Sequence, residues 1–214
     1  MASSCRGFQS TGESRTIRPM SAQLYLASRS PRRAQFLREL GLRFETLAAD
    51  VPEQPAPGQL PADYALATAL SKARAAAALA PLGLPVLGAD TDVSIDGEIL
   101  GKPRDRDDAL AMLARLSGRT HEVCSAVVVI AGARVESALT VTRVSFGAID
   151  AAQAQAYWAS GEPADKAGAY AIQGHAARWV KRIEGSYSGV VGLPLYETCE
   201  LLRRFGVDCT GSVA

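Results

Sequence analysis

The chain has 214 residues, with 23 Lys and Arg against 22 Asp and Glu, and 48% of its residues are hydrophobic. This length and composition can bury a sizeable core, which excludes a wholly disordered or collagen-like protein. The net charge of +1 argues against a general nucleic-acid binder, and no apolar run reaches the roughly 20 residues of a membrane-spanning helix. We therefore expect a globular protein with neither a nucleic-acid nor a membrane partner. The four scattered cysteines lack a Cys-x-x-Cys pair and are typical of free thiols in a reducing cytoplasm.

The two ends of the chain differ from the rest. Residues 1–21 are rich in Ser and Thr and show no helical or strand periodicity, so we expect a flexible N-terminal tail. Met20 is a second candidate for the start of translation. Residues 208–214 resemble a short C-terminal tail, which leaves one domain at 22–207.

Within this domain, apolar runs alternate with helical patterns. We expect strands at 24–27, 44–48, 85–89, 122–130 and 135–146, and helices at 31–40, 61–80, 106–116, 150–160 and 195–205. Such interleaving favours an α/β architecture with a mixed sheet.

The segment Ser28-Arg29-Ser30-Pro31-Arg32-Arg33 joins the first predicted strand to the first predicted helix. Ser30 is a favourable N-cap, and Pro31 suits the first helical turn. A helix N-terminus offers free backbone N–H groups to an anion, and neighbouring arginines add charge and bidentate geometry. The segment predicts a phosphate-binding turn. The alternative, an exposed basic first turn, is disfavoured by the helix dipole.

Two further segments carry polar side chains next to strands. Gly88-Ala89-Asp90-Thr91 ends the third predicted strand, where open α/β sheets bind ligands, so Asp90 can hold a metal or act as a base. An Asp that ends a strand is also a common turn-former. The segment 97–103 is one residue short of a P-loop and has Pro103 in place of the hydroxyl, which excludes a Walker-type ATPase. A glycine hairpin that presents Lys102 to a phosphate remains open.

A long connection at 160–174 is dense in glycine and charge, and long irregular segments of this kind are often functional. Gln173 carries both donor and acceptor groups and is suited to reading the edge of a base. The alternative is a glutamine that caps backbone groups in a loop.

Together these segments resemble a known family. The Lys72-Ala73 pair and the segments LASRSPRR, GADT, GKP, SGRTHE, SGEPADKAGAYAIQG and GSYSGVVGLPLYE follow the order and spacing of the Maf family of nucleotide pyrophosphatases, over about 22–207. The resemblance implies a fold like that of the inosine triphosphate pyrophosphatases: a mixed twisted sheet flanked by helices, with two lobes around a cleft. It also implies divalent-cation-dependent hydrolysis of a nucleoside triphosphate to monophosphate and pyrophosphate, and a homodimer. The AYAIQG and GSYSGVVGLPL segments resemble the branch that acts on dTTP and UTP.

On this resemblance, the catalytic acid-base position is Asp90, and the specificity positions are Arg32, Thr91 and Gln173. The other polar positions that match the family site are Ser28, Arg33, Glu53, Lys72, Lys102 and Lys166. Cleaving a triphosphate requires cations to neutralise the leaving pyrophosphate and a carboxylate to activate water. We assign the phosphates to Arg32, Arg33, Lys72 and Lys102, and Mg²⁺ or Mn²⁺ to Glu53 and Asp90.

Two departures from the family pattern modify these expectations. Asp92 stands where relatives usually carry an apolar strand residue, and it either perturbs Asp90 by like-charge repulsion or faces solvent. Residues 174–179 are bulkier and more basic than usual, which predicts a shifted preference, toward modified pyrimidine nucleotides. The alternative functions are a 7-methyl-GTP pyrophosphatase of the same family and a non-catalytic nucleotide-binding regulator of cell division.

Overall fold

The computed structural model describes residues 21–81 and 83–210. The predicted N-terminal tail at 1–21 therefore lies outside the described residues except for Ser21, and the predicted C-terminal tail is described only at 208–210. Within the described ranges, no helix is long and apolar enough to cross a membrane.

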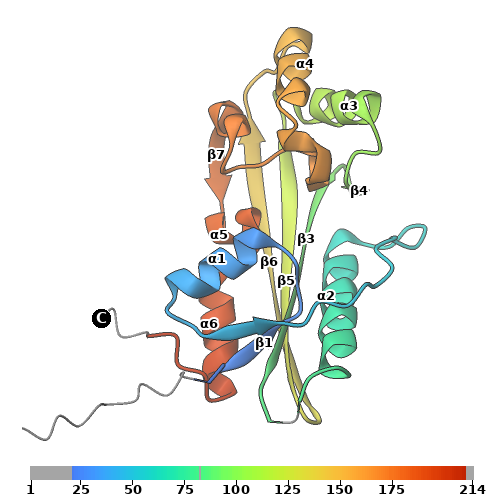
Figure 1. Ribbon diagram of the computed structural model, residues 1–214. Helices are drawn as coiled ribbons and strands as arrows, with labels where there is room; N and C mark the ends of the chain where they lie inside the picture. The colour runs from blue at the N-terminus through green and yellow to red at the C-terminus, as the bar shows by residue number, and fades with distance from the viewer. Residues whose placement is uncertain (1–20, 82, 211–214) are drawn as a thin grey trace, which may run out of the picture.

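One mixed seven-stranded sheet forms the centre of the molecule (Figure 1). Its order is β2-β1-β3-β5-β6-β7, and β4 pairs with β3 outside this path. The pairs β1–β2 and β1–β3 are parallel, whereas the other pairs are antiparallel. The strands are β1 Leu24–Leu26, β2 Phe44–Thr46, β3 Val86–Ile95, β4 Glu98–Leu100, β5 Thr120–Ala131, β6 Arg134–Phe146 and β7 Val180–Glu184.

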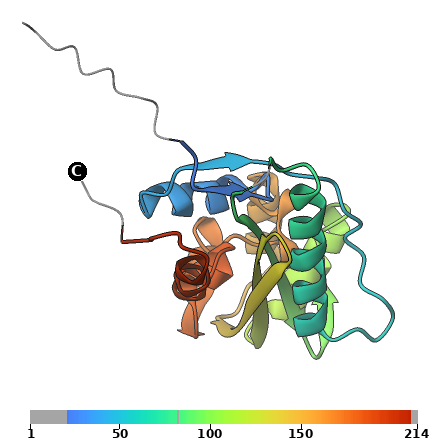
Figure 2. The ribbon, with the colours of Figure 1, turned by 90° about the horizontal axis from the view of Figure 1, so that it is seen from below.

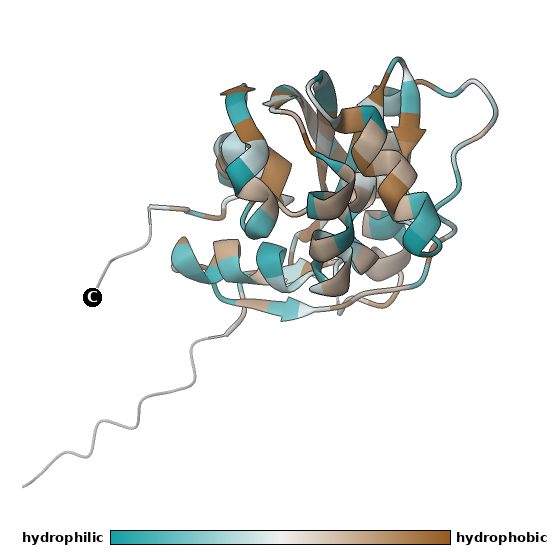
Figure 3. Ribbon diagram, turned by 90° about the horizontal axis from the view of Figure 1, so that it is seen from above, coloured by the Kyte–Doolittle hydropathy of each residue, from teal (hydrophilic) through white to brown (hydrophobic). Residues whose placement is uncertain are grey.

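Helices surround this sheet, and hydrophilic and hydrophobic residues alternate along them (Figure 3). The α-helices are α1 Pro31–Glu39, α2 Pro61–Ala77, α3 Arg106–Leu116, α4 Ala151–Ala159, α5 Tyr187–Val191 and α6 Leu195–Arg204. The short 3₁₀ helices η1 Glu162–Asp165, η2 Ala167–Ala169 and η3 His175–Trp179 follow α4. The predicted α/β architecture with a mixed sheet flanked by helices is confirmed, while α5, β4, β7 and the 3₁₀ turns were not predicted.

The predicted helix at 61–80 is too long at its C-terminal end. α2 ends at Ala77, and Leu79 beyond it is 64% exposed. The face of α2 that packs on the sheet is made of alanines, among them Ala69 and Ala73, which are fully buried. These small side chains let the helix backbone approach β3 so closely that a Cβ on Gly88 would lie 2.5 Å from the Ala69 carbonyl oxygen.

The predicted strand at 85–89 is too short, and the expectation that Asp90 ends it is wrong. β3 continues through Asp90 to Ile95 because the alternation resumes at Val93 and Ile95, both of which are buried. A tight hairpin follows, in which Asp96 and Gly97 both adopt positive φ and β4 pairs back onto β3. The glycine hairpin before Lys102 is therefore present.

The pairing of β3 leaves a notch in the sheet. On one edge, β3 pairs with β1 at Val86 and Leu87, and then with β4 from Val93 onward. Between these two stretches, residues 88–92 of β3 have no neighbouring strand on that edge within the described chain. The chain leaving β1 turns away at this point into the N-terminus of α1, so a cavity opens at the carboxyl end of β1, as expected for an α/β sheet.

The two faces of β3 lead to different helices. Gly88, Asp90 and Asp92 pair with residues of β5 that pack beneath α2. Leu87 and Ala89 face α1 and α6, and Thr91 shares this side because strand side chains alternate. Figure 2 shows α2 and α6 on opposite sides of the long strands.

The long strands β3, β5 and β6 connect two lobes (Figure 1). A hydrophobic cluster built from α3, α4, η2 and the far end of β3 fills one lobe. Two separate hydrophobic clusters fill the other lobe: one lies between the sheet and the helices α1 and α6, and the other lies between the sheet and α2. The notch in the sheet lies where the lobes meet.

Candidate active site

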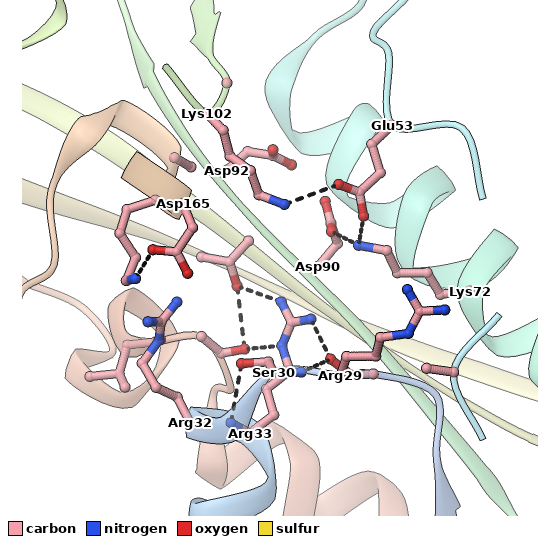
Figure 4. A pocket seen from close by; sticks show the side chains of 18 of the residues that line it. Arg29, Ser30, Arg32, Arg33, Glu53, Lys72, Asp90, Asp92, Lys102 and Asp165 are labelled. Atoms are coloured by element: carbon pink, nitrogen blue, oxygen red, sulfur yellow. Dashed lines mark hydrogen bonds and ion pairs between the residues drawn. The ribbon is translucent and has the colours of Figure 1, made fainter. Parts of the chain in front are cut away.

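A cavity of about 920 Å³ occupies the notch. Both lobes line it. Its charged side chains come from the turn between β1 and α1, from α1, α2 and β3, from the loops that follow β2 and β4, and from the end of η1 (Figure 4). Six cationic side chains face five carboxylates. The cationic residues are Arg29, Arg32, Arg33, Lys72, Lys102 and Lys166, and the acidic residues are Asp50, Glu53, Asp90, Asp92 and Asp165.

The turn from β1 into α1 has the predicted capping geometry. Ser30 is the N-cap of α1, its hydroxyl accepts a hydrogen bond from the Arg33 backbone N–H, and Pro31 occupies the first turn. Ser28 is buried, and its hydroxyl accepts a hydrogen bond from the Ser30 backbone N–H at 3.2 Å. The Arg32 Nε donates to the Val191 carbonyl at 3.2 Å. This turn therefore forms one wall of the cavity.

Arg33 differs from an exposed phosphate ligand because its guanidinium is already used inside the protein. It is 9% exposed and donates to the Gly192 carbonyl at 2.8 Å, to the Ser28 hydroxyl at 3.2 Å and to the Thr91 hydroxyl at 3.4 Å. Burial lowers the pKa of Arg33 from its ordinary value. These three bonds connect β1, β3 and the α5–α6 turn. Because each terminal nitrogen carries a second N–H, Arg33 still has donors for a phosphate.

Thr91 lies on the side of β3 that faces this network. Its hydroxyl donates to the Gly192 carbonyl at 3.3 Å and accepts from Arg33, and the buried Ser125 hydroxyl oxygen lies 3.3 Å from it. Ser125 in turn donates to the Gly189 carbonyl at 2.6 Å. Thr91 therefore lines the cavity in a fixed orientation.

An ion-pair cluster forms on the opposite face of β3. Lys72 of α2 places its ammonium 2.5 Å from Asp90 Oδ1 and 2.6 Å from Glu53 Oε1. Lys102 approaches the other oxygen of Glu53 at 3.7 Å. Partial burial opposes ionisation of Glu53, but the bond from Lys72 and the nearby lysines hold its pKa below the ordinary value. Four residues predicted from distant segments thus meet at one point (Figure 4).

Asp92 does not face solvent, so one of the two expectations for this residue is wrong. It is 7% exposed, lies two residues after Asp90 on the same face of β3, and lines the cavity. Burial, followed by the negative charge of Asp90, raises the pKa of Asp92 far above that of an ordinary carboxyl group.

The connection at 160–174 contributes unevenly. Lys166 forms an ion pair with Asp165, and both Lys166 and Tyr170 line the cavity. Gln173 is exposed and is not among the residues that line the cavity, so the structure does not bring this predicted base reader to the others.

An anchor next to Gln173 fixes the same segment. The Glu162 carboxylate accepts hydrogen bonds from the Tyr157 hydroxyl at 2.6 Å and from the His175 backbone N–H at 3.0 Å, and contacts the His175 ring at 3.0 Å. The Tyr157 hydroxyl also accepts a bond from the Ala171 backbone N–H at 3.0 Å. Residues 171–175 are therefore tied to the end of α4.

Several residues of the site were missed by sequence reasoning. Tyr170 is 5% exposed, forms a wall of the cavity and bonds the His121 ring through its hydroxyl at 2.8 Å. Asp50 pairs with Arg29 at the rim at 2.7 Å. Tyr170 lies within the AYAIQG segment and could have been found from it, whereas nothing local marks Asp50 as part of the cavity.

The donor atoms suit a hard divalent cation. Glu53, Asp90 and Asp92 supply only carboxylate oxygens, and Mg²⁺ usually binds one or two carboxylates together with substrate phosphates. Within the described ranges, no three His, Cys, Asp or Glu side chains form a ready-made metal cluster. The residues therefore fit a cation that arrives with a phosphate ligand rather than one enclosed by protein alone.

Comparisons with known proteins complete this description. The family model of the Maf-like proteins matches residues 23–205. A dTTP/UTP pyrophosphatase of Xanthomonas campestris pv. campestris is 53% identical over 187 residues, covering 86% of this chain and 98% of that protein. A dTTP/UTP pyrophosphatase of Methylobacillus flagellatus is 49% identical over 191 residues, covering 89% and 96%. Among solved structures, the Staphylococcus aureus Ham1 protein is similar with a TM-score of 0.42 and 12% identity, over 57% of this chain and 71% of that chain.

Proposed function

This chain belongs to the Maf family, and we propose that it is a pyrophosphatase that hydrolyses dTTP and UTP to the monophosphate and pyrophosphate. The observation that carries the proposal is the meeting of Lys72, Asp90 and Glu53 in one cavity with Arg32 and Arg33. This arrangement offers a carboxylate base and cations for a polyphosphate. The choice of substrate is supported by the relatives named dTTP/UTP pyrophosphatase, which are 53% and 49% identical to this chain.

In the reaction, a water oxygen forms a bond to the α-phosphorus, and the bond from that phosphorus to the bridging oxygen breaks. Asp90 accepts the proton of the water, and pyrophosphate leaves with the bridging oxygen. Positioned acid-base groups of this kind contribute about 10²- to 10⁴-fold to a rate. Asp90 is suited to the role because β3 and Lys72 fix its orientation.

The cations of the cavity neutralise the leaving group. Arg32 and Arg33 make no ion pair with any described residue, so their charge is available to the phosphates. Lys102 is 61% exposed and extends into the cavity from the loop after β4. Such preorganised positive charge stabilises the transition state most where water is excluded.

Glu53 and Asp90 are the residues that would hold Mg²⁺ or Mn²⁺. The cation supplies Lewis-acid charge to the phosphate oxygens. The bond from Lys72 and the nearby lysines hold the pKa of Glu53 below its ordinary value, and Lys72 also contacts Asp90.

Recognition of the base rests on the other lobe. Tyr170 presents a buried ring to the cavity, and Gln173 lies on the segment that Glu162 anchors. We propose that Gln173 reaches the pyrimidine edge when nucleotide is bound, with Arg32 and Thr91 completing the specificity set. The basic segment at 174–179 adjoins this position, which makes modified pyrimidine nucleotides worth including among the test substrates.

The test measures pyrophosphate release from a panel of canonical and modified triphosphates with Mg²⁺. We expect dTTP and UTP to be the best substrates, and Asp90→Asn to lower kcat by about 100-fold or more. Asp107→Asn is the control, because it makes the same chemical change at an exposed carboxylate that pairs with Arg106 and does not line the cavity. A preference for 7-methyl-GTP would overturn the substrate assignment. Tight nucleotide binding without turnover would instead support a regulatory role.

A further inference from the structure

The carboxylate of Asp92 has no assigned role, and its environment is unusual for a structural residue. It is 7% exposed and lines the cavity, and its Oδ2 atom has no hydrogen-bond partner among the described residues. A buried carboxylate without a partner is costly, so such a group is normally paired with a cation or a donor.

The nearest cation is already committed. The Lys72 ammonium contacts Asp90 and Glu53 at 2.5 Å and 2.6 Å, and neither contact involves Asp92. Lys102 is directed to Glu53 at 3.7 Å. The structure therefore contains a buried carboxyl oxygen beside the ion-pair cluster that no donor or cation among the described residues contacts.

Geometry places this oxygen beside the predicted ligand Asp90. Side chains two residues apart on a strand share a face, so Asp90 and Asp92 both project toward the α2 side of β3. Lys72 uses Oδ1 of Asp90, so Oδ2 is the oxygen that this ion pair leaves for another ligand. Figure 4 shows Asp92 beside Lys102 and Asp90, on the same side of the strand as Glu53.

We propose that Asp92 is a third carboxylate ligand of the divalent-cation site, acting with Asp90 and Glu53 while Lys72 stays in place. The proposal rests on the proposed function, because it concerns the same cavity and the same class of substrate. It explains why an acid occupies a buried strand position that an apolar residue would fill at lower cost. It also explains the unpartnered oxygen, which becomes a ligand when a hard cation is bound.

A different role for Asp92 makes the opposite prediction. If the side chain only supports Asp90 by a hydrogen bond, an amide at the same position can donate that bond, and cation affinity stays unchanged. Asp92→Asn therefore separates the two roles with almost no change of shape.

The experiment titrates Mn²⁺ into the purified full-length protein and measures protein-bound Mn²⁺ by electron paramagnetic resonance, with and without an α,β-methylene analogue of UTP that cannot release pyrophosphate. We expect Asp92→Asn to weaken Mn²⁺ affinity about tenfold or more. Asp107→Asn should leave the affinity unchanged, because Asp107 is exposed, pairs with Arg106 and does not line the cavity. Asp92→Ser serves as a second variant, and thermal unfolding without metal confirms that each variant is folded. Wild-type affinity in both folded Asp92 variants, or no measurable Mn²⁺ binding by the wild type, would overturn the proposal.

Pyrophosphate release by the wild type is measured in parallel, so that the two proposals can fail separately. If the wild type releases pyrophosphate and Asp92→Asn binds Mn²⁺ normally, the ligand assignment fails and the proposed function stands. If Mn²⁺ affinity depends on Asp92 but no triphosphate is hydrolysed, the proposed function fails and the cation site stands.

Discussion

The close contact between α2 and β3 makes Gly88 a sensitive position. A Cβ at this residue would lie 2.5 Å from the Ala69 carbonyl oxygen and 2.7 Å from the Ala73 Cβ. Since carbon atoms pack at about 3.5–4.0 Å, Gly88→Ala would force the helix and the strand apart by roughly 1 Å. Overpacking of this kind costs about 1–3 kcal/mol, and the lower entropy of the unfolded chain offsets about 0.4–1 kcal/mol of it.

We therefore expect Gly88→Ala to be destabilised by about 1–2 kcal/mol, which lowers the Tm by about 5 °C in a protein of this size. Activity should fall further than stability alone requires, because α2 carries Lys72 and β3 carries Asp90, whose contact is 2.5 Å. A displacement of about 1 Å at a catalytic contact can lower kcat by up to about 100-fold.

The assays are differential scanning calorimetry and pyrophosphate release at a temperature well below the Tm of the variant. Gly147→Ala is the matched control for stability, because the nearest atom to its added Cβ is 3.7 Å away, an ordinary contact. If Gly88→Ala keeps both the Tm and the kcat of the wild type, the argument that tight α2–β3 packing sets the Lys72–Asp90 distance is wrong.

Three further predictions follow from buried or paired groups. Burial lowers the pKa of His121 from 6.5 to about 4, so the unfolded chain binds a proton first as the pH falls. The free energy of unfolding should then decrease by about 3 kcal/mol between pH 6.5 and 4. Urea unfolding across this pH range should show that this free energy depends less on pH in His121→Asn than in the wild type, and an unchanged pH dependence would contradict this pKa. Lys72→Met leaves Asp90 and Glu53 without their shared cation and should reduce pyrophosphate release by about 100-fold, whereas near-normal kcat would exclude an essential role. Glu162→Ala removes the anchor of residues 171–175 and should raise KM for dTTP more than it lowers kcat; an unaltered KM would separate this segment from substrate binding.

Much of the fold could be predicted because the signals are local. The helix at Arg106–Leu116 was predicted with its observed bounds, since its apolar stripe is regular and an N-capping Asp precedes it. The first helix was predicted equally well from Ser30 and Gly41. The α5 helix and β7 were missed because each is only five residues long, which is too short for periodicity to appear.

The length of β3 could not be predicted from the same signals. Asp90 and Asp92 interrupt its apolar pattern, and acidic residues normally mark the end of a buried strand. The strand continues because its other face still alternates, with Val93 and Ile95 buried in the second lobe. The rule that acidic residues end a buried strand fails here because Asp90 and Asp92 belong to the candidate active site.

Most residues of the candidate site could be predicted, but the hydrogen bonds between them could not. Lys72, Asp90, Glu53 and Lys102 come together as expected, because the motifs that carry them lie on elements around one notch. Two of the three internal bonds of Arg33 could not be foreseen, since they join segments more than 50 residues apart. The exposed position of Gln173 likewise could not be predicted, because the short 3₁₀ helices of its loop produce no periodic pattern in the sequence.

The charge pattern of the cavity links the cation site to the phosphate site. Six cationic side chains face five acidic ones, and the pKa of Asp92 is raised far above that of an ordinary carboxyl group, so positive charge exceeds ionised acid in the cavity and attracts a polyphosphate. Glu53 is paired with both Lys72 and Lys102, and Asp90 is paired with Lys72. These carboxylates would hold a divalent cation while Lys72 stays in place. Arg32 and Arg33 make no ion pair with any described residue, so the paired lysines would order the ligands of the cation and the two arginines would bind the phosphates.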